Sequence, residues 1–131
     1  MSRSALSGYR FLVVEDEYLI AVEVCEVLRD HGADVVGPVP TTRQGLAELV
    51  RDGIQAAVLD VNLRGETVFP LADALAAEGV PILYVTGYDA RALPPDRRDA
   101  VILGKPVDRD RLIRAAIDMV AGSGDNQTEG A

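Results

Sequence analysis

Cysteine, positive charge and long apolar runs are all scarce in this sequence. Cys25 is the single cysteine, so no disulfide can form within the chain. This fits a protein that works in a reducing compartment. Lysine and arginine number 13 against 21 aspartates and glutamates, and the net charge of −8 argues against nucleic acid or an anionic membrane as the main partner. No apolar run approaches the roughly 20 residues that span a bilayer, and "MSRSALSGYR" lacks the apolar core of a signal peptide. We therefore expect a cytoplasmic protein.

The sequence does contain a regular alternation of short apolar runs and longer amphipathic ones. With 131 residues and a hydrophobic share of 48%, the chain can build one core. Short apolar runs predict strands over residues 10–14, 34–39, 56–60, 81–86 and 100–103. Apolar residues at helical spacing predict helices over residues 17–32, 41–53, 69–79 and 108–121.

Two further segments lie outside this alternation. Pro94 and Pro95 interrupt the segment before the last strand, so we expect at most a short or mobile fourth helix there. The small and polar end of the chain predicts a disordered tail. The predicted organisation is an N-terminal extension over residues 1–9, one domain over residues 10–121 and a tail over residues 122–131.

Strands that alternate with helices predict a doubly wound α/β fold, in which helices cover both faces of a parallel sheet. Runs such as "FLVV" and "AAVL" fit strands that are buried on both faces. Ligands in such folds bind outside the carboxyl ends of the strands. The residues that follow each strand are therefore the candidate functional residues.

Acidic groups, a hydroxyl and an ammonium group stand at these strand ends. Glu15 and Asp16 follow the first strand, Asp60 ends the third, Thr86 ends the fourth, and Lys105 follows the fifth. Clustered carboxylates repel one another unless a cation lies among them, and such oxygen ligands suit Mg²⁺. Aspartate can accept a phosphoryl group covalently, and a hydroxyl and an ammonium group can stabilise its charge. These residues predict a phosphoryl-acceptor site on Asp60.

Three charged residues near these motifs are interpreted as ordinary surface groups. Glu17 fits a solvated helix start, where an acid complements the helix dipole. Arg64 fits a solvated loop charge, and His31 fits a favourable position at a helix C-terminus.

Four motifs in order, "LVVEDE", "VLDVNL", "VTGY" and "LGKP", resemble the response-regulator receiver domain of two-component signalling. The resemblance covers residues 10–121, and the spacings of 44, 26 and 19 that separate Asp16, Asp60, Thr86 and Lys105 in turn suit that family. It implies a flavodoxin-like three-layer sandwich around a five-stranded parallel sheet of order 2-1-3-4-5.

The resemblance also implies a role for each acidic residue. Asp60 matches the phosphorylated aspartate, and Glu15 and Asp16 match the acidic pair that places Mg²⁺ beside it. Asn62 matches the residue whose main-chain carbonyl completes the metal site. Glu15 stands where the family more often has aspartate, so we expect it to reach the metal through a water.

The remaining motif residues are assigned in the same way. Thr86 matches the hydroxyl residue that turns toward the phosphoryl group, and Lys105 the lysine that pairs with it. Asn62 and Tyr88 match positions that tune the lifetime of the phosphoryl group. Ile102 replaces an aromatic switch residue, so rotation of a ring there is excluded as the output signal.

"YVTGYD" with "LGKP" resembles in part a receiver subfamily with a Phe-Ala-Thr-Gly-Tyr motif. That subfamily implies a stand-alone receiver that works with a histidine kinase of the HWE or HisKA2 type. The first predicted helix carries a second apolar strip beside its core stripe, at the place where kinases dock on receivers. We therefore expect Tyr18, Val22 and Cys25 to form a docking patch.

The predicted function is that of a single-domain response regulator. It receives a phosphoryl group on Asp60 from a sensor histidine kinase or a phosphotransfer protein, and it binds a downstream protein or acts as a phosphate sink. We expect a monomer or a phosphorylation-dependent dimer, with no catalysis beyond its own phosphorylation and dephosphorylation.

Three other functions are compared with this prediction. A haloacid-dehalogenase-type phosphatase needs a second acid where Asn62 stands. A flavin or nucleotide module needs a phosphate-cradling loop where the acidic "EDEYL" stands. A degenerate receiver that binds partners without phosphorylation remains an alternative.

Overall fold

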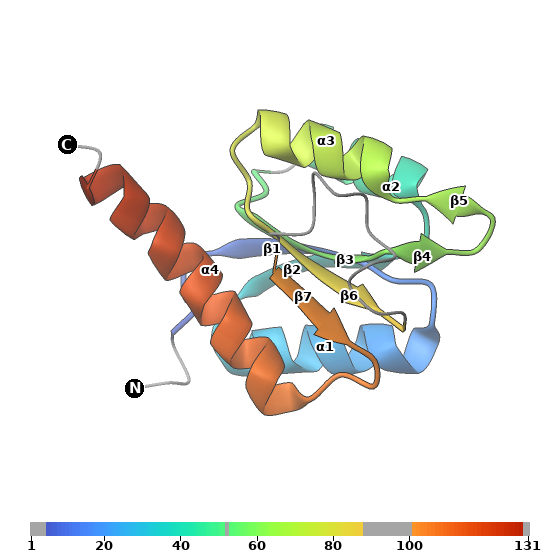
Figure 1. The fold of residues 1–131 in the computed structure, drawn as a ribbon, viewed down its shortest axis with the longest axis horizontal. Helices are drawn as coiled ribbons and strands as arrows, with labels where there is room; N and C mark the ends of the chain where they lie inside the picture. Colours follow the sequence, from blue (N-terminus) through green and yellow to red (C-terminus); the bar gives the residue numbers. More distant parts are fainter. Residues whose placement is uncertain (1–4, 52, 88–100, 130–131) are drawn as a thin grey trace.

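The computed structural model describes residues 5–51, 53–87 and 101–129, and within these ranges five parallel strands form one sheet. The strands are β1 (Arg10–Val14), β2 (Asp34–Val39), β3 (Ala56–Asp60), β6 (Ile82–Thr86) and β7 (Val101–Gly104). Their order in the sheet is β2-β1-β3-β6-β7, which confirms the predicted order 2-1-3-4-5 when these five are numbered along the chain (Figure 1). All five residues of β3 are buried, as its uninterrupted apolar run predicts for a central strand.

Four helices cover the two faces of the sheet in the described part of the chain: α1 (Tyr18–Asp30), α2 (Thr42–Arg51), α3 (Phe69–Ala77) and α4 (Arg109–Glu129). Helices α1 and α4 lie on one face and α2 and α3 on the other (Figure 1). The alternation of side chains along β1 sends Phe11 and Val13 into the first layer and Leu12 and Val14 into the second. The flavodoxin-like three-layer arrangement is therefore confirmed.

Two predicted segments lie wholly or partly outside the described residues. The short or mobile fourth helix falls on residues 88–100, which lie outside the described residues. Helix α4 continues to Glu129, so the described part of the predicted disordered tail is helical rather than irregular. The physical reason is that no proline follows Ala121, and glycine lowers helix propensity without removing a hydrogen-bond donor. The described helices include none with the length and apolar character needed to cross a membrane.

A short hairpin follows directly after Asp60 and was not predicted. Strands β4 (Asn62–Leu63) and β5 (Glu66–Thr67) pair antiparallel across a two-residue turn, in which Gly65 has a φ of +70°. Two hydrogen bonds fasten β5 to the start of α2. The main-chain N–H of Thr42 donates to Glu66 Oε1 at 2.9 Å, and the Thr42 hydroxyl donates to the carbonyl of Thr67 at 2.7 Å.

Candidate functional site

The acidic residues meet because β1 and β3 are neighbours whose carboxyl ends lie at the same edge of the sheet. Val14 pairs with Leu59, so Glu15 and Asp60 leave the sheet side by side. Both are buried, with 5% and 1% of their surface exposed. One carboxylate oxygen from each of Glu15, Asp16 and Asp60 can be chosen so that all three lie within 4.8 Å of one another. The predicted acidic cluster is therefore present.

Lys105 reaches this cluster from the loop after β7. Its main-chain N–H donates to the carbonyl of Thr86 at 2.9 Å, which fixes the loop against the end of β6. Its Nζ atom lies 3.3 Å from Glu15 Oε2 and 3.3 Å from Asp60 Oδ2. A third carboxylate is closer, because Glu17 Oε1 lies 2.6 Å from the same Nζ atom.

Main-chain N–H groups hold the three carboxylates of the cluster in place. These hydrogen bonds run from Glu17 to Glu15 Oε2 at 3.0 Å, from Arg64 to Asp16 Oδ2 at 2.9 Å, and from Asn62 to Asp60 Oδ1 at 3.0 Å. Backbone donors do not change rotamer, so the carboxylates are oriented before any ligand binds.

Burial and charge shift the acid–base properties of the cluster. Burial raises the pKa of Glu15 to about 7, and the neighbouring Asp60 carboxyl adds to this shift. Burial also raises the pKa of Asp60, although hydrogen bonds from its surroundings and the charge of Lys105 oppose it. For Lys105, burial favours a lower pKa, but the carboxylates of Glu17, Glu15 and Asp60 outweigh it and raise the pKa. The carboxylates around Lys105 therefore carry more negative charge than its single ammonium group neutralises.

This donor set fits a divalent cation. Lys105 supplies one positive charge to a site that holds four carboxylates, counting Glu17 and Asp16. Carboxylate oxygens suit Mg²⁺, which usually binds one or two protein carboxylates and completes its coordination with waters. Glu15, Asp16 and Asp60 are the residues that could hold such an ion.

Beside these groups lies a cleft of about 440 Å³ that opens to solvent. It is lined by Asp16, Glu17, Asp60, Asn62, Arg64, Gly87 and Lys105. Asn62, which the resemblance assigns to the metal site and to tuning, therefore borders the same cleft as Asp60. Thr86 is buried at the end of β6, the strand next to β3, and Tyr88 lies outside the described residues.

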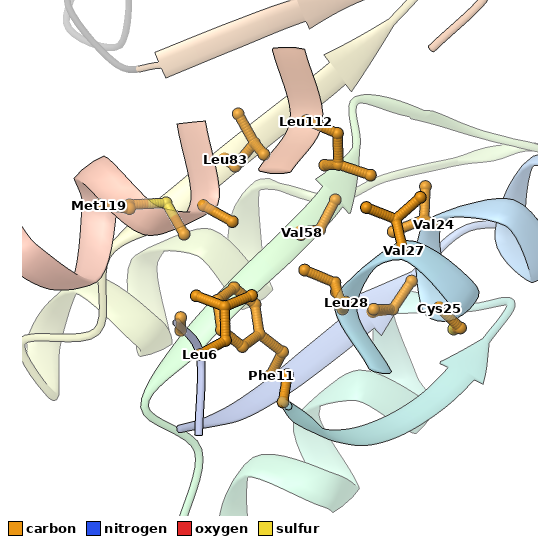
Figure 2. Close-up of a cluster of buried hydrophobic side chains, with 14 of the residues drawn as sticks. Leu6, Phe11, Val24, Cys25, Val27, Leu28, Val58, Leu83, Leu112 and Met119 are labelled. Carbon is orange, nitrogen blue, oxygen red and sulfur yellow. The ribbon is translucent and has the colours of Figure 1, made fainter. Parts of the chain in front are cut away.

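The predicted docking patch on α1 is wrong in one member. Tyr18 is 76% exposed and Val22 is half-buried, but only 1% of the surface of Cys25 is exposed. Figure 2 shows Cys25 among the buried side chains of the core that includes Val24 and Leu28. The reason is that α1 packs over both β1 and β2, which buries a wider face than one stripe.

Two residues that were interpreted as surface charges also border the site, although the Arg64 side chain is 90% exposed, as expected for a solvated loop charge. Glu17 makes the shortest of the described ion pairs of Lys105, and Arg64 lines the cleft while its main-chain N–H holds Asp16. The signal for Glu17 was its position as a third consecutive acid after a strand end. No local signal marked Arg64, because its contact crosses 48 positions of the chain.

No family model matches the chain, but solved structures and curated proteins similar to it were found. The solution structure of SdrG from Sphingomonas melonis Fr1 is 39% identical, with a TM-score of 0.77 over 89% of this chain and 98% of that one. A BeF₃-activated conformation of SdrG is matched at 36% identity with a TM-score of 0.74 over 92% of this chain and 99% of that one.

Two longer proteins match part of their length. The response regulator PhyR from Brucella abortus has a TM-score of 0.84 at 21% identity, over 96% of this chain and 54% of that one, and so shows the fold alone. The transcriptional regulatory protein PdtaR of Mycobacterium tuberculosis is 31% identical over 112 residues, which are 81% of this chain and 54% of PdtaR. The chain thus spans about half the length of the curated relatives it matches.

Proposed function

The chain belongs to the response-regulator receiver family of two-component signalling, and on this premise we propose that Asp60 accepts a phosphoryl group from a histidine kinase or a phosphotransfer protein. One observation carries the proposal. The buried Asp60 carboxylate lies 3.3 Å from the Lys105 ammonium group and within 4.8 Å of oxygens from Glu15 and Asp16.

The transfer step is a nucleophilic substitution at phosphorus. An Asp60 carboxylate oxygen attacks phosphorus, and the phosphorus–nitrogen bond of phosphohistidine breaks with its electron pair going to the imidazole. In the second half of the cycle water attacks phosphorus, the bond to Asp60 breaks, and inorganic phosphate leaves while the carboxylate is regenerated. Lys105 is within reach of the Asp60 oxygen and can pair with the charge that arrives there.

Mg²⁺ is the proposed cofactor of this step. Glu15, Asp16 and Asp60 would hold it, and the family resemblance adds the main-chain carbonyl of Asn62. When bound, the ion supplies positive charge for phosphoryl oxygens. The backbone hydrogen bonds to the three carboxylates keep their free oxygens in place for it.

The output is proposed to be an interaction with another protein. We propose a cytoplasmic, single-domain receiver that binds a target when phosphorylated or drains phosphoryl groups from a kinase, without further catalysis. The partial match of "YVTGYD" to the Phe-Ala-Thr-Gly-Tyr motif supports a kinase of the HWE or HisKA2 type. The near-complete alignment with SdrG supports the receiver-domain assignment.

The test is the intact mass of the protein after incubation with acetyl phosphate, with and without Mg²⁺. We expect one Mg²⁺-dependent phosphoryl adduct in the wild type and none in Asp60→Asn. Asp110→Asn, an exposed aspartate in the first turn of α4, serves as the matched control and should be labelled normally. A wild type that stays unlabelled while a known receiver is labelled would overturn the proposal in favour of a phosphorylation-independent binding module.

A further inference from the structure

Glu17 differs from the other two carboxylates that contact Lys105. Its Oε1 atom lies 2.6 Å from Nζ, whereas the nearest oxygens of Glu15 and Asp60 are each 3.3 Å away. The Glu17 side chain is 50% exposed, whereas those of Glu15 and Asp60 are almost completely buried. Among the described residues, the group whose oxygens could hold a metal ion comprises Glu15, Asp16 and Asp60, without Glu17.

The backbone of Glu17 holds this carboxylate in reach of Lys105. Its N–H donates to Glu15 Oε2 at 3.0 Å, and its carbonyl accepts the first hydrogen bond of α1, from Ala21 at 2.9 Å. Glu17 occupies the N-cap position, yet in the described structure its side chain caps no N–H of the helix. The carboxylate is directed to Lys105 instead.

We propose that Glu17 is a positioning residue that competes with a phosphoryl group on Asp60 for the Lys105 ammonium group. This inference rests on the proposed function, because it needs a phosphoryl group at Asp60. The Lys105 ammonium group has three protons and already contacts three carboxylates, so a phosphoryl oxygen has to displace one of them. Glu17 has the shortest of these contacts, so it opposes loading and weakens the loaded state. The exposed and flexible Glu17 side chain can turn to solvent, whereas the buried carboxylates cannot.

The chain offers a direct reporter for this exchange, because Lys105 is the only lysine in the sequence. Protein made with ¹⁵N-lysine gives one side-chain ¹⁵Nζ resonance, which reports the ion pairs of this group. We expect a large change of this resonance in metal-free Glu17→Gln, where the amide cannot replace the ion pair. With Mg²⁺ present, the affinity for BeF₃⁻, a phosphoryl mimic, should rise about threefold to fivefold, the range for loss of one competing ion pair to a half-exposed side chain.

Two variants separate the contact from the charge. Glu78→Gln removes the same charge from an exposed site outside the cleft, and it should leave both the resonance and BeF₃⁻ affinity unchanged. Glu17→Asp keeps the charge but is shorter by one methylene, and aspartate is a good N-cap that turns to the first N–H groups of α1. It should therefore change the resonance as Glu17→Gln does.

The outcomes distinguish this inference from the proposed function. If the wild type binds no BeF₃⁻ and takes no phosphoryl group, the proposed function fails. If the wild type binds BeF₃⁻ while Glu17→Gln has an unchanged resonance and an unchanged affinity, the role of Glu17 is overturned alone. An effect of Glu78→Gln equal to that of Glu17→Gln would overturn it too, since net charge would then explain the result.

Discussion

The main-chain N–H of Arg64 donates a 2.9 Å hydrogen bond to Asp16 Oδ2 across 48 positions of the chain. Arg64 and Gly65 form the turn of the β4–β5 hairpin, and the Arg64 side chain, 90% exposed, lies 3.9 Å from the same oxygen through Nε. The other end of the hairpin is tied to α2 through the hydrogen bond from Thr42 to Glu66. The position of Asp16, a proposed metal ligand, is therefore set by a hairpin that is hydrogen-bonded to a helix on the opposite face of the sheet from α1.

Gly65→Ala should weaken Mg²⁺ binding without touching a metal ligand. Gly65 has a φ of +70°, where an alanine costs about 1 kcal/mol of stability, and the turn can relieve this strain by moving the Arg64 N–H. Loss of a hydrogen bond that orients a metal ligand lowers metal affinity by about tenfold or more. A partial displacement of the Arg64 N–H from Asp16 should therefore lower the Mg²⁺ affinity by up to about tenfold. Isothermal titration with Mg²⁺ measures the affinity, and urea unfolding measures the stability.

Gly79→Ala is the matched control for this prediction. Gly79 has a φ of +75°, and at both glycines an added methyl group would meet no atom within 4 Å. Gly79 follows α3 and is absent from the lining of the cleft, so its substitution should lower stability equally and leave Mg²⁺ affinity unchanged. Equal loss of Mg²⁺ affinity in both variants would show that general destabilisation is the cause.

The sequence predicted the part of the site that depends on chain order. Glu15 and Asp60 each end or follow an apolar run, and parallel strands bring such positions to one edge, so their meeting followed from the alternation alone. Lys105 could be assigned in the same way, because it also follows a strand. These relations depend on topology and not on side-chain detail.

The remaining features depend on tertiary packing. Strands β4 and β5 have two residues each, which is too short for an alternating pattern to indicate them. Burial of Cys25 depends on which strands α1 packs against, and apolar spacing along the helix does not specify them. The Glu17–Lys105 ion pair depends on the reach of two long side chains, which no local rule predicts.

The stability of the metal-free protein should fall as the pH rises from about 4.5 to about 7. Glu15 has an ordinary pKa of 4.5 and a folded-state pKa of about 7, so in this window the folded state binds more protons than the unfolded state. The folded state therefore loses stability as the proton is removed, and the raised pKa of Asp60 acts in the same direction. The Glu15 contribution is on the order of 3 kcal/mol, since one pKa unit is worth about 1.4 kcal/mol.

Urea unfolding at several pH values in the presence of EDTA measures this slope. Glu15→Gln should remove most of it, because the amide carries no proton that depends on pH. Glu78→Gln, which changes an exposed glutamate, should keep the slope of the wild type. The explanation fails if Glu15→Gln unfolds with the same pH dependence as the wild type.

Lys105→Met should destabilise the metal-free protein by about 3 kcal/mol, because it leaves buried carboxylates without their cation. Its side chain is 15% exposed and contacts two carboxylates that are almost fully buried. Arg109→Met is the comparison, since Arg109 also faces three acids, Glu23, Glu26 and Asp30, but is 48% exposed. Such surface pairs contribute about 1 kcal/mol or less.

Addition of Mg²⁺ should have different effects on the stability of Lys105→Met and Arg109→Met. It should restore part of the stability of Lys105→Met, because a dication compensates the same carboxylates, and it should not affect the loss in Arg109→Met. Thermal unfolding with and without Mg²⁺ measures both effects. Equal losses in the two variants, with no recovery in Lys105→Met, would contradict an excess of buried negative charge at the site.

Tyr18→Glu should slow phosphotransfer from a histidine kinase and leave labelling by acetyl phosphate unchanged. Tyr18 and Leu19 are 76% and 80% exposed at the start of α1, directly after the acidic residues of the site. An exposed tyrosine in a contact surface contributes 1 kcal/mol or more when it is a dominant contact, so a charge there should cost about tenfold in transfer rate. Val22 is half-buried, so a charge at that position would also lower stability and is the weaker test.

Val50→Glu is the control for the docking surface. Val50 is 86% exposed on α2, which covers the opposite face of the sheet from α1, and its substitution makes a comparable apolar-to-acidic change (Figure 1). Transfer from a kinase that phosphorylates the wild type should be normal in Val50→Glu and slow in Tyr18→Glu. A loss of labelling by acetyl phosphate in Tyr18→Glu would instead indicate damage to the neighbouring acidic cluster, because a small donor needs no docking surface.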